Sequence, residues 1–192
     1  MSPYRDRVDA YNIQVLNSLP GETVCFQAQD ILNGVRPIPC SQEHTFDTLQ
    51  PLLLLKKGAQ VVVTQNLSSS IKNGTLGVID SITPDSVSLL YYRRSGGPRK
   101  VTIHRKIEYL HLGTSTISRH QFPLALAFGL TIHKCQGLTL RKVIIDMSLS
   151  FFQTGMAYVA FSRAPSLENI TILGWDPNSF FVDEVSKLRY MD

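Results

Sequence analysis

Five consecutive residues, His133 to Gly137, place a histidine, a lysine, a cysteine, a glutamine and a glycine side by side in the stretch TIHKCQG. Three kinds of chemistry use such residues. They are metal binding, nucleophilic attack by a cysteine beside a histidine, and contact with a phosphate or a nucleic acid. The spacing of these residues and the rest of the sequence decide among the three.

The spacing argues against a metal site. His133 and Cys135 lie two positions apart, so on a helix they point to different faces. The other histidines, at positions 44, 104, 111 and 120, form no H-x3-H or HExxH pattern, and the three cysteines include no CxxC pair. A catalytic cysteine–histidine pair is brought together by the fold rather than by adjacency, and a small buried thiol is a commoner use of cysteine. We predict no metal site and assign no chemistry to Cys135.

Phosphate contact fits the glycine of this stretch. A single glycine lets backbone N–H groups approach a phosphate closely, although one glycine alone is weak evidence. The sequence contains no G-x4-G-K-[ST] motif, and no acidic pair follows an apolar strand as a magnesium-binding element requires. We infer that the chain does not build a complete nucleoside triphosphate site by itself.

Arg163 is a second candidate, at the end of an apolar helical pattern that runs GMAYVAFSRA. An arginine is permanently charged and forked, which suits a phosphoryl group presented by another surface. The alternative is a structural arginine that pairs with Asp146 or Glu168. The sequence alone leaves both interpretations open.

Charge is unevenly distributed along the 192 residues. The net charge of +4 comes from 19 basic and 15 acidic residues, but the segment Arg93 to Lys106 holds six basic residues and no acidic one. That segment is either a solvated hairpin face or a patch that faces phosphates.

The longest apolar run, PLLLLKKG, is too short for a membrane span, and the N-terminus has no apolar signal region. We expect no membrane partner and an intracellular protein, of the nucleus, mitochondrion or cytoplasm.

The elements that must position these residues follow from periodicity. Helical spacing predicts a helix from Ser2 to Leu19, and further helices over residues 124–132, 155–164 and 177–188. Short apolar runs predict strands at residues 23–28, 58–66, 142–147 and 169–175. Residues 29–49 show no clear period and are expected to form a surface connection. Several short strand patterns between residues 76 and 121 predict a small barrel or sandwich, so strand–helix alternation on both sides indicates an α/β domain with a β insertion.

Three ordered segments resemble one family. FPLALAFGLTIHKCQGLTL, GMAYVAFSRA and LKKGAQVVVTQN…IKNGTLGVI are similar to the C-terminal half of superfamily 1 DNA helicases of the petite-integration-frequency (PIF) and RecD type. Within them, TIHKCQG is similar to motif V and YVAFSRA to motif VI, and the N-terminal SPYRDRVDAYN looks like a version of motif IV. The resemblance covers most of the chain from about Leu55 onward, with a looser match in the first helix.

The resemblance implies an α/β fold. Residues 1–75 and 122–192 would form the second RecA-like domain, a parallel sheet with helices on both faces, and residues 76–121 a small inserted Src-homology-3-like β-barrel. ATP would bind between this domain and a first RecA-like domain, which carries the Walker A lysine and the acidic magnesium motif that this sequence lacks. Because Met1 lies just before motif IV, the chain is expected to be a fragment or a separate subunit, and a departure from motif VI described below favours a divergent copy.

The resemblance also implies roles at the nucleotide. Arg163 would be an arginine finger that reaches the γ-phosphate of ATP, and Gly137 would bring its backbone N–H to the same phosphate. Gln136 would couple the nucleotide to the DNA strand, and Arg5 is a further candidate for a γ-phosphate contact. The family usually has glutamine after the glycine that opens motif VI, whereas Met156 follows Gly155 here. That departure puts a nucleotide contact from this position in doubt.

Contacts with single-stranded DNA are implied at two places. Thr131, His133 and Lys134 would touch phosphate and sugar, and Asn66, Asn73 and Gly74 would line the DNA channel. The implied activity is ATP hydrolysis with Mg²⁺, coupled to 5′→3′ movement along one strand, with this chain inactive unless a first RecA-like domain joins it. The alternatives are a non-catalytic nucleic-acid-binding module and a protein-interaction scaffold.

Overall fold

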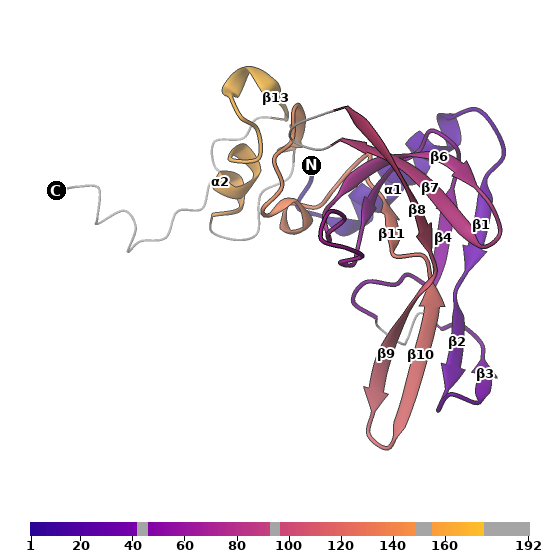
Figure 1. Cartoon of the computed structure of the whole chain (residues 1–192). Helices are drawn as coiled ribbons and strands as arrows, with labels where there is room; N and C mark the ends of the chain where they lie inside the picture. Colours follow the sequence, from indigo (N-terminus) through magenta and orange to yellow (C-terminus); the bar gives the residue numbers. More distant parts are fainter. Residues whose placement is uncertain (42–45, 93–96, 149–154, 175–192) are drawn as a thin grey trace. The chain divides into compact units, whose positions relative to one another are not determined.

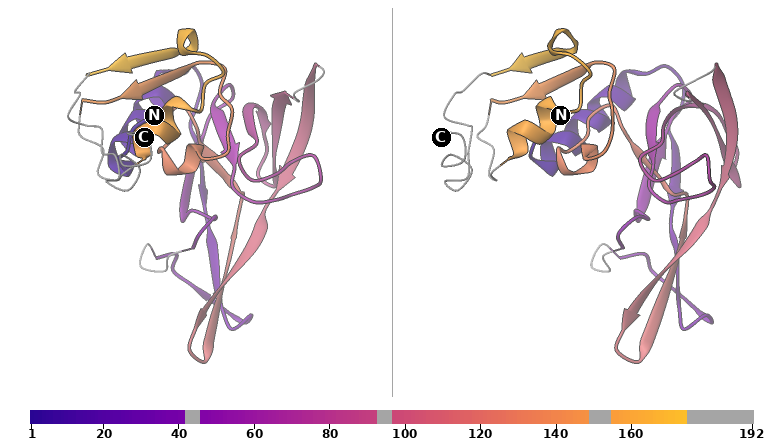
Figure 2. Two further views of the ribbon diagram at one scale, coloured as in Figure 1. Left: turned by 90° about the vertical axis from the view of Figure 1, so that its left-hand side faces the viewer. Right: turned by 60° about the vertical axis from the view of Figure 1, so that its left-hand side comes forward.

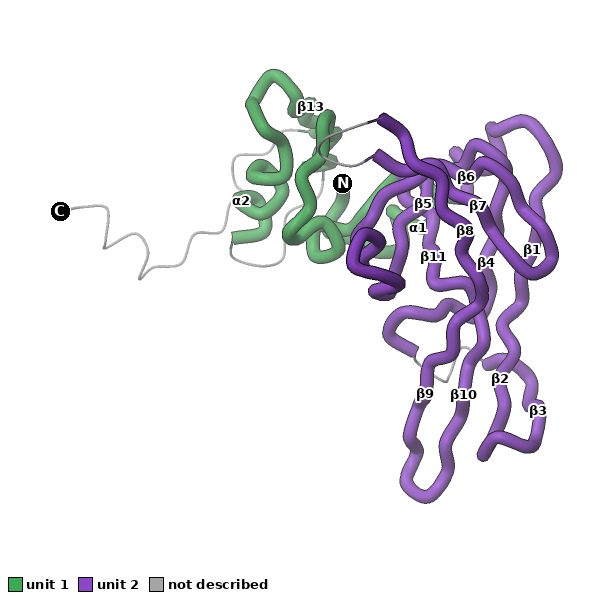
Figure 3. Tube along the Cα trace, viewed as in Figure 1, with its two compact units in different colours: residues 1–12, 129–192 green, residues 13–128 purple. Residues whose placement is uncertain are grey.

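The computed structural model describes residues 1–41, 46–92, 97–148 and 155–174 (Figure 1). Contacts divide the chain into two compact units, drawn in different colours in Figure 3. The first unit comprises residues 1–12 and 129–192, and the second comprises residues 13–128. Helix α1 (Arg5–Ser18) has residues in both units, because the division falls between Asn12 and Ile13.

The first unit is built on parallel backbone pairing. Strand β12 (Val143–Asp146) pairs in parallel with β13 (Ile170–Leu173). Met1 pairs with β12 as well, because its amino group donates to the C=O of Ile144 and its C=O accepts the N–H of Asp146 at 2.8 Å. The predicted strands at residues 142–147 and 169–175 are therefore confirmed.

Ser2 extends the parallel pairing to Thr131, the first residue of the predicted site. It forms a parallel bridge with Thr131, in which its N–H donates to Leu130 at 3.4 Å and its C=O accepts from Ile132 at 3.3 Å. Because Ser2 is extended in this pairing, α1 begins at Arg5 rather than at Pro3, while its predicted existence is confirmed. The chain leaves the parallel ladder at Thr131 and enters the TIHKCQG segment.

A small apolar core lies beside this ladder. Helix α2 (Met156–Phe161), predicted from the sequence, buries one face against the strand β12 and the residue Ile132. The buried members of this core come from α2, from β12 and the residue that follows it, and from the residue before the 3-10 turn. They are Ile132, Val143, Ile145, Met147, Met156, Ala157 and Ala160.

The second unit consists mainly of antiparallel sheets. A two-stranded sheet pairs β1 (Val24–Gln27) with β4 (Leu52–Leu55). A five-stranded sheet has the order β11 (Leu124–Leu126), β5 (Gln60–Val63), β6 (Leu76–Ile82), β7 (Ser86–Tyr92) and β8 (Pro98–His104). A four-stranded sheet has the order β3 (Arg36–Ile38), β2 (Gln29–Leu32), β10 (Ser115–Gln121) and β9 (Lys106–Leu112). Figure 2 shows the β9–β10 hairpin extending beyond the five-stranded sheet.

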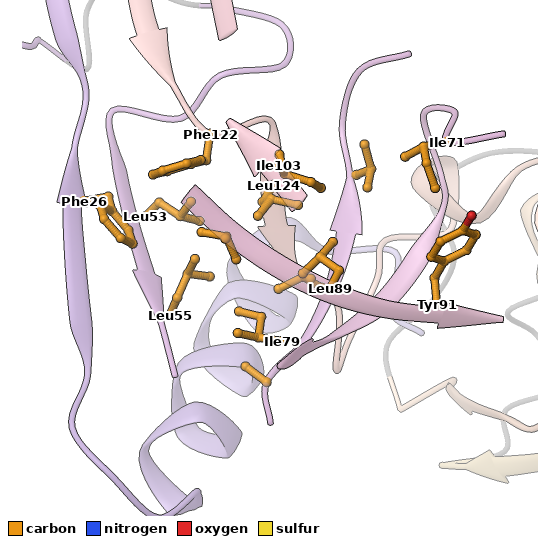
Figure 4. Packing of buried hydrophobic residues seen from close by; sticks show 14 of the residues in the cluster. Phe26, Leu53, Leu55, Ile71, Ile79, Leu89, Tyr91, Ile103, Phe122 and Leu124 are labelled. Atoms are coloured by element: carbon orange, nitrogen blue, oxygen red, sulfur yellow. The ribbon is translucent and has the colours of Figure 1, made fainter. Parts of the chain in front are cut away.

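One hydrophobic core joins the two-stranded and the five-stranded sheets (Figure 4). Leu55 from β4, Leu89 from β7 and Leu124 from β11 are each at most 1% exposed and belong to the same cluster. The rings of Phe26 and Phe122 meet edge to face at a centroid distance of 4.9 Å. Burial of each large side chain stabilises the unit by about 1.5–3 kcal/mol, so the core fixes the strands around it.

The inserted closed barrel is not confirmed. The sheets are not closed: among the described strands, β11 and β8 each have a single neighbour in the five-stranded sheet. Strands within the predicted insertion share sheets with strands outside it, since β6 pairs with β5 and β10 pairs with β2. Ile79, Leu89 and Ile103 also share one core with Leu55 and Leu124. The domain boundaries predicted at residues 75/76 and 121/122 remain a prediction.

Two predicted segments differ in the structure. Residues 124–132 were expected to be helical, but Leu124–Leu126 form β11 beside β5. The prediction failed because periodicity does not distinguish a short buried strand from a buried helix. Residues 29–49 were expected to be a surface connection, but they contain β2 and β3. Asp30 is buried in β2, whereas a charged residue in a sequence normally indicates a position that faces solvent. The alternation of buried and exposed positions along β2 was therefore not visible in the sequence. The helix predicted over residues 177–188 lies outside the described residues.

Candidate functional site

The TIHKCQG segment forms a turn of 3-10 helix that continues directly into a β-turn. The 3-10 turn is His133–Cys135, and the N–H of Cys135 donates to Thr131 and Ile132, both at 3.1 Å. The N–H of Leu138 then donates to the C=O of Cys135 at 3.0 Å, which closes a four-residue turn.

The β-turn explains why a glycine is needed. Gln136 has φ −58° and ψ 127°, and Gly137 has φ +81°. These angles are those of a type II turn, whose third residue must adopt a positive φ and is therefore usually glycine. A β-carbon built on Gly137 meets no atom within 4 Å, so the backbone of the turn is open to a ligand.

The open backbone offers a donor. Within the described part of the chain, the N–H of Gly137 has no hydrogen-bond acceptor. Both Gln136 and Gly137 are exposed. An exposed N–H at a glycine turn is suited to a phosphate oxygen, which is what the sequence predicted for this position.

Every third residue of the segment, Ile132 and Cys135, is buried, and the residues between and after them are exposed. Ile132 is 1% exposed and Cys135 is 0% exposed, and they anchor the segment in the first unit. His133 and Lys134 are exposed, and Thr131 is half-buried. The N–H of Lys134 donates to Oγ1 of Thr131 at 3.4 Å, so the first three predicted DNA contacts lie together on one turn.

Burial makes the Cys135 thiol unreactive. Desolvation raises the pKa of Cys135 to about 11, while the α-amino group of Met1 and the guanidinium of Arg163 act in the opposite direction. At neutral pH the thiol is therefore protonated, and a protonated, buried thiol is a poor nucleophile. Cys135 acts through its packing.

Arg163 lies just after helix α2 and is held by oxygen acceptors. Its Nε donates to the C=O of Val159 at 2.9 Å, one terminal nitrogen donates to the C=O of Leu138 at 3.3 Å, and the other donates to Oγ of Ser162 at 2.8 Å. These bonds leave N–H donors of the half-buried guanidinium without an acceptor among the described residues. The side chain is thus held in one orientation while part of its hydrogen-bonding capacity stays available for a ligand.

The structure joins Arg163 to the glycine turn. Besides the bond from its guanidinium to Leu138, its own C=O accepts the N–H of Leu140 at 2.8 Å. Leu138 is the residue that follows Gly137. Two segments that resemble separate motifs are therefore tied together by two hydrogen bonds within the first unit.

Among the described ion pairs, none supports the structural alternative for Arg163. The carboxylate of Asp146 instead accepts hydrogen bonds from Ser148 and from Arg7, the latter at 3.3 Å. Burial alone raises the pKa of Asp146, but these hydrogen bonds outweigh it and hold the pKa below its ordinary value. Asp146 is occupied by Arg7, and Arg163 remains oriented by neutral oxygens.

Met156, the departure from the helicase pattern, fills space in the core. Gly155 precedes helix α2 with φ +79°, and the Met156 side chain is 4% exposed and packs among the apolar residues of the first unit. A buried methionine stabilises the packing of α2. The structure gives this position no polar group to offer a nucleotide.

No protein-family model matches the chain. A curated relative, the ATP-dependent DNA helicase PIF1 of Danio rerio, is 35% identical over 176 residues, which is 91% of this chain and 27% of that protein. The chain is a homologue of PIF1-family DNA helicases. It spans about a quarter of the length of this curated PIF1 relative.

Solved PIF1 structures share the fold. The crystal structure of Pif1 helicase from Candida albicans matches with a TM-score of 0.83 and 28% identity, over 100% of this chain and 49% of that chain. Pif1 from Bacteroides in complex with ADP-AlF3 and ssDNA matches with a TM-score of 0.68 and 25% identity, over 100% of this chain and 43% of that chain. The chain therefore has a mostly-sheet α/β fold that matches a region of Pif1 helicases.

One predicted nucleotide contact of the PIF1-homologous chain, Arg5, has a described partner of its own on helix α1. Arg5 is exposed at the start of α1 and pairs with Asp9 at 3.6 Å. No described interaction connects Arg5 with Gly137 or Arg163, so its predicted phosphate contact remains untested by the geometry.

The remaining predicted DNA contacts of this PIF1 homologue come together in the second unit. The N–H of Asn73 donates to Oδ1 of Asn66 at 2.9 Å, and the N–H of Gly74 donates to the C=O of Val63 at 2.8 Å. Gly74 has φ +88°, in a turn closed by a bond from the N–H of Thr75 to Lys72, as the Asn-Gly pattern predicted. Asn66 and Asn73 are both exposed.

The basic segment from Arg93 to Lys106 is partly used inside the second unit of the PIF1 homologue. Lys100 pairs with Asp80 at 2.6 Å. Arg105 lies over the Phe122 ring at 4.9 Å and donates to Oε1 of Gln121 at 3.1 Å. Because these two cations already have partners within the second unit, fewer basic residues of the segment are available to face phosphates. Arg93 and Arg94 lie outside the described residues.

The part of the PIF1 homologue that the structure describes contains no cluster of three or more histidine, cysteine, aspartate or glutamate side chains suited to a metal ion. Within the same residues, none of the helices is long and apolar enough to cross a membrane.

Sequence reasoning missed three residues that support the Asn66 loop. Thr48, Gln65 and Glu108 are linked by hydrogen bonds, although the first and the last lie 60 residues apart. They belong to no recognisable motif. No local signal in the sequence could have paired them, because a long-range contact leaves no periodic pattern.

Proposed function

We propose that the chain is the C-terminal motor half of an ATP-dependent DNA helicase that moves 5′→3′ along single-stranded DNA. Homology to PIF1 helicases supports the class of enzyme, and the geometry of the first unit supports the division of roles. Single-stranded DNA and ATP are the expected partners, as in the Bacteroides Pif1 complex with ADP-AlF3 and ssDNA.

The observation that carries this proposal is the bond between Arg163 and the glycine turn. The guanidinium and the Gly137 N–H are attached to one short segment, through Leu138, and both keep donors without acceptors among the described residues. A phosphoryl group that is transferred needs positive charge and N–H donors where negative charge develops. We assign the arginine finger to Arg163, a backbone contact to Gly137 and the coupling of nucleotide to DNA to Gln136, with Arg5 as a second phosphate contact.

The DNA contacts are proposed on the same turn. Thr131, His133 and Lys134 lie within five residues before Gln136 on one continuous turn, so a shift of the glycine turn on ATP binding displaces them as well. Asn66, Asn73 and Gly74 supply a second set of contacts from the other unit. Contacts with phosphate and sugar are independent of base sequence, as movement along a strand requires.

A first RecA-like domain, in the same or another chain, completes the proposed site. That domain holds the Walker A lysine and most of the Mg²⁺ ligands, and Mg²⁺ neutralises charge on the phosphates when it is bound. On this proposal, the 192-residue chain binds single-stranded DNA weakly and hydrolyses no ATP by itself.

Substitution of Arg163 tests the proposal in a protein that joins this chain to a first RecA-like domain. Arg163→Ala is expected to lower kcat for ATP hydrolysis by about 10³-fold or more, because an arginine finger contributes 10³–10⁵ in rate. Binding of a fluorescent oligothymidylate is expected to change little. Turnover that stays intact in Arg163→Ala contradicts the finger assignment.

Arg163→Lys is the matched variant, since it keeps the charge but loses the fork that bonds Val159, Leu138 and Ser162. We expect it to recover a minor part of the rate. Full recovery shows that charge alone suffices, and a fall in the melting temperature of both variants shows a structural role instead.

A further inference from the structure

The carboxylate of Glu108, on strand β9, holds a loop that is distant in sequence. It accepts the backbone N–H of Asp47 at 2.9 Å, of Thr48 at 3.2 Å and of Leu49 at 3.0 Å, together with the Thr48 hydroxyl at 2.6 Å. Successive N–H groups that converge on one anion form a strong and directional site. Residues 47–49 are therefore fixed to the β9–β10 hairpin.

Thr48 passes this restraint to the end of strand β5. Its hydroxyl donates to Glu108 and accepts a hydrogen bond from Nε2 of Gln65 at 2.6 Å. Its C=O accepts the hydroxyl of Thr64 at 2.9 Å. The donors run in one direction, from Gln65 through Thr48 to the Glu108 carboxylate, and bonds aligned in this way polarise and strengthen one another.

The chain of hydrogen bonds ends beside the Asn66 loop. Gln65 directly precedes Asn66, whose Oδ1 accepts the N–H of Asn73. Because Oδ1 is the acceptor, Nδ2 of the exposed Asn66 remains a donor, and it has no acceptor among the residues that the structure describes. A donor held in this way can meet a phosphate oxygen without first losing rotational freedom.

We propose that Glu108, acting through Thr48 and Gln65, is a positioning residue that orients Asn66 toward a phosphate of single-stranded DNA. The inference rests on the proposed DNA contact of Asn66. A half-buried carboxylate saturated by N–H groups thus contributes to DNA binding despite its charge. Its effect is to fix the backbone from which the Asn66 amide extends.

The test is a double-mutant cycle on the 192-residue chain, with affinity for a fluorescent oligothymidylate as the readout. Glu108→Gln is expected to weaken binding about fivefold, because loss of the oriented Asn66 hydrogen bond to DNA removes about 1 kcal/mol of binding free energy. In the background of Asn66→Ala, the same change is expected to have no further effect. Glu22→Gln, at an exposed position of the same unit, removes the same charge and is expected to strengthen binding slightly.

Two further variants keep the inference testable if Glu108→Gln does not fold. Thr48→Val removes the linking hydroxyl and is expected to weaken binding to the same extent, whereas Thr48→Ser retains the hydroxyl and restores it. Equal losses with and without Asn66, or no loss at an unchanged melting temperature, overturn the positioning role. If Asn66→Ala alone leaves the affinity unchanged, the proposed DNA contact itself is wrong, and the positioning role fails with it.

Discussion

The guanidinium of Arg163 donates to the C=O of Leu138 at 3.3 Å, directly beyond Gly137. An arginine after helix α2 and a glycine after a parallel pairing are thus parts of one hydrogen-bonded unit. A type II turn has its own rigid backbone, so the two groups keep a fixed relation to each other. If ATP closes the cleft to a first RecA-like domain, both groups approach the phosphate together.

Gly137→Ala tests the open backbone. We expect a loss of about 1 kcal/mol in the free energy of unfolding, because alanine is strained at φ +81°. We also expect a fall in ATP turnover of at least tenfold in the two-domain protein, because the new methyl group lies beside the N–H offered to phosphate. Urea unfolding and steady-state ATPase assays measure the two effects.

Gly21→Ala is the control for that experiment. Gly21 has φ +91°, and a β-carbon added there meets no atom within 4 Å, so its backbone strain is similar. It lies far from the turn in sequence and has no proposed role. Similar losses of stability with turnover lost only at Gly137 support the phosphate contact, and an equal fall in turnover for both variants refutes it.

His133→Ala and Lys134→Ala address the coupling of DNA to ATP. Both side chains are exposed on the 3-10 turn that leads into Gln136. In the two-domain protein we expect ATP turnover stimulated by single-stranded DNA to fall about fivefold or more, because each variant removes a charged or polar phosphate contact. Turnover without DNA is expected to stay nearly constant. An equal loss of both rates indicates a structural role for the turn.

The glycine turn and the Asn-Gly turn were predictable from sequence because both are local. A positive φ favours glycine wherever it occurs, so Gly137 and Gly74 indicate their turns. The parallel pairing of Ser2 with Thr131 was not predictable, since it joins residues that are remote in the chain. The same is true of Asp30, which looks like a loop residue until Arg119 is seen to neutralise it. Long-range polar pairs of this kind leave no period in the sequence.

The Asp30–Arg119 pair yields a prediction about stability. Its side chains are 0% and 1% exposed, and the carboxylate accepts two hydrogen bonds from the guanidinium, at 2.8 and 2.7 Å. Asp30→Asn is expected to destabilise the second unit by about 3–5 kcal/mol, because it leaves a buried arginine without its counter-charge. Chemical denaturation measures the loss.

The double variant Asp30→Leu with Arg119→Met is the comparison for the buried pair. Replacing both charges by apolar groups removes the desolvation cost as well as the attraction, so we expect most of the lost stability to return. A double variant as unstable as Asp30→Asn shows that the bonds from Arg119 to the C=O groups of Leu49 and Ser41 matter more than the charge pair.

The buried thiol of Cys135 predicts that the free energy of unfolding depends on pH in the alkaline range. Burial raises the pKa of Cys135 from 9.0 in its ordinary state to about 11 in the fold. A group whose folded pKa is raised contributes its stability fully below the unfolded pKa and loses it as pH rises to the folded pKa. We therefore expect the free energy of unfolding to fall between pH 9 and 11. Because lysines and tyrosines also titrate there, the measurement is the difference from Cys135→Ala, whose stability is expected to fall less steeply in urea titrations across this window. Parallel pH profiles for the two proteins contradict a buried thiol that resists ionisation.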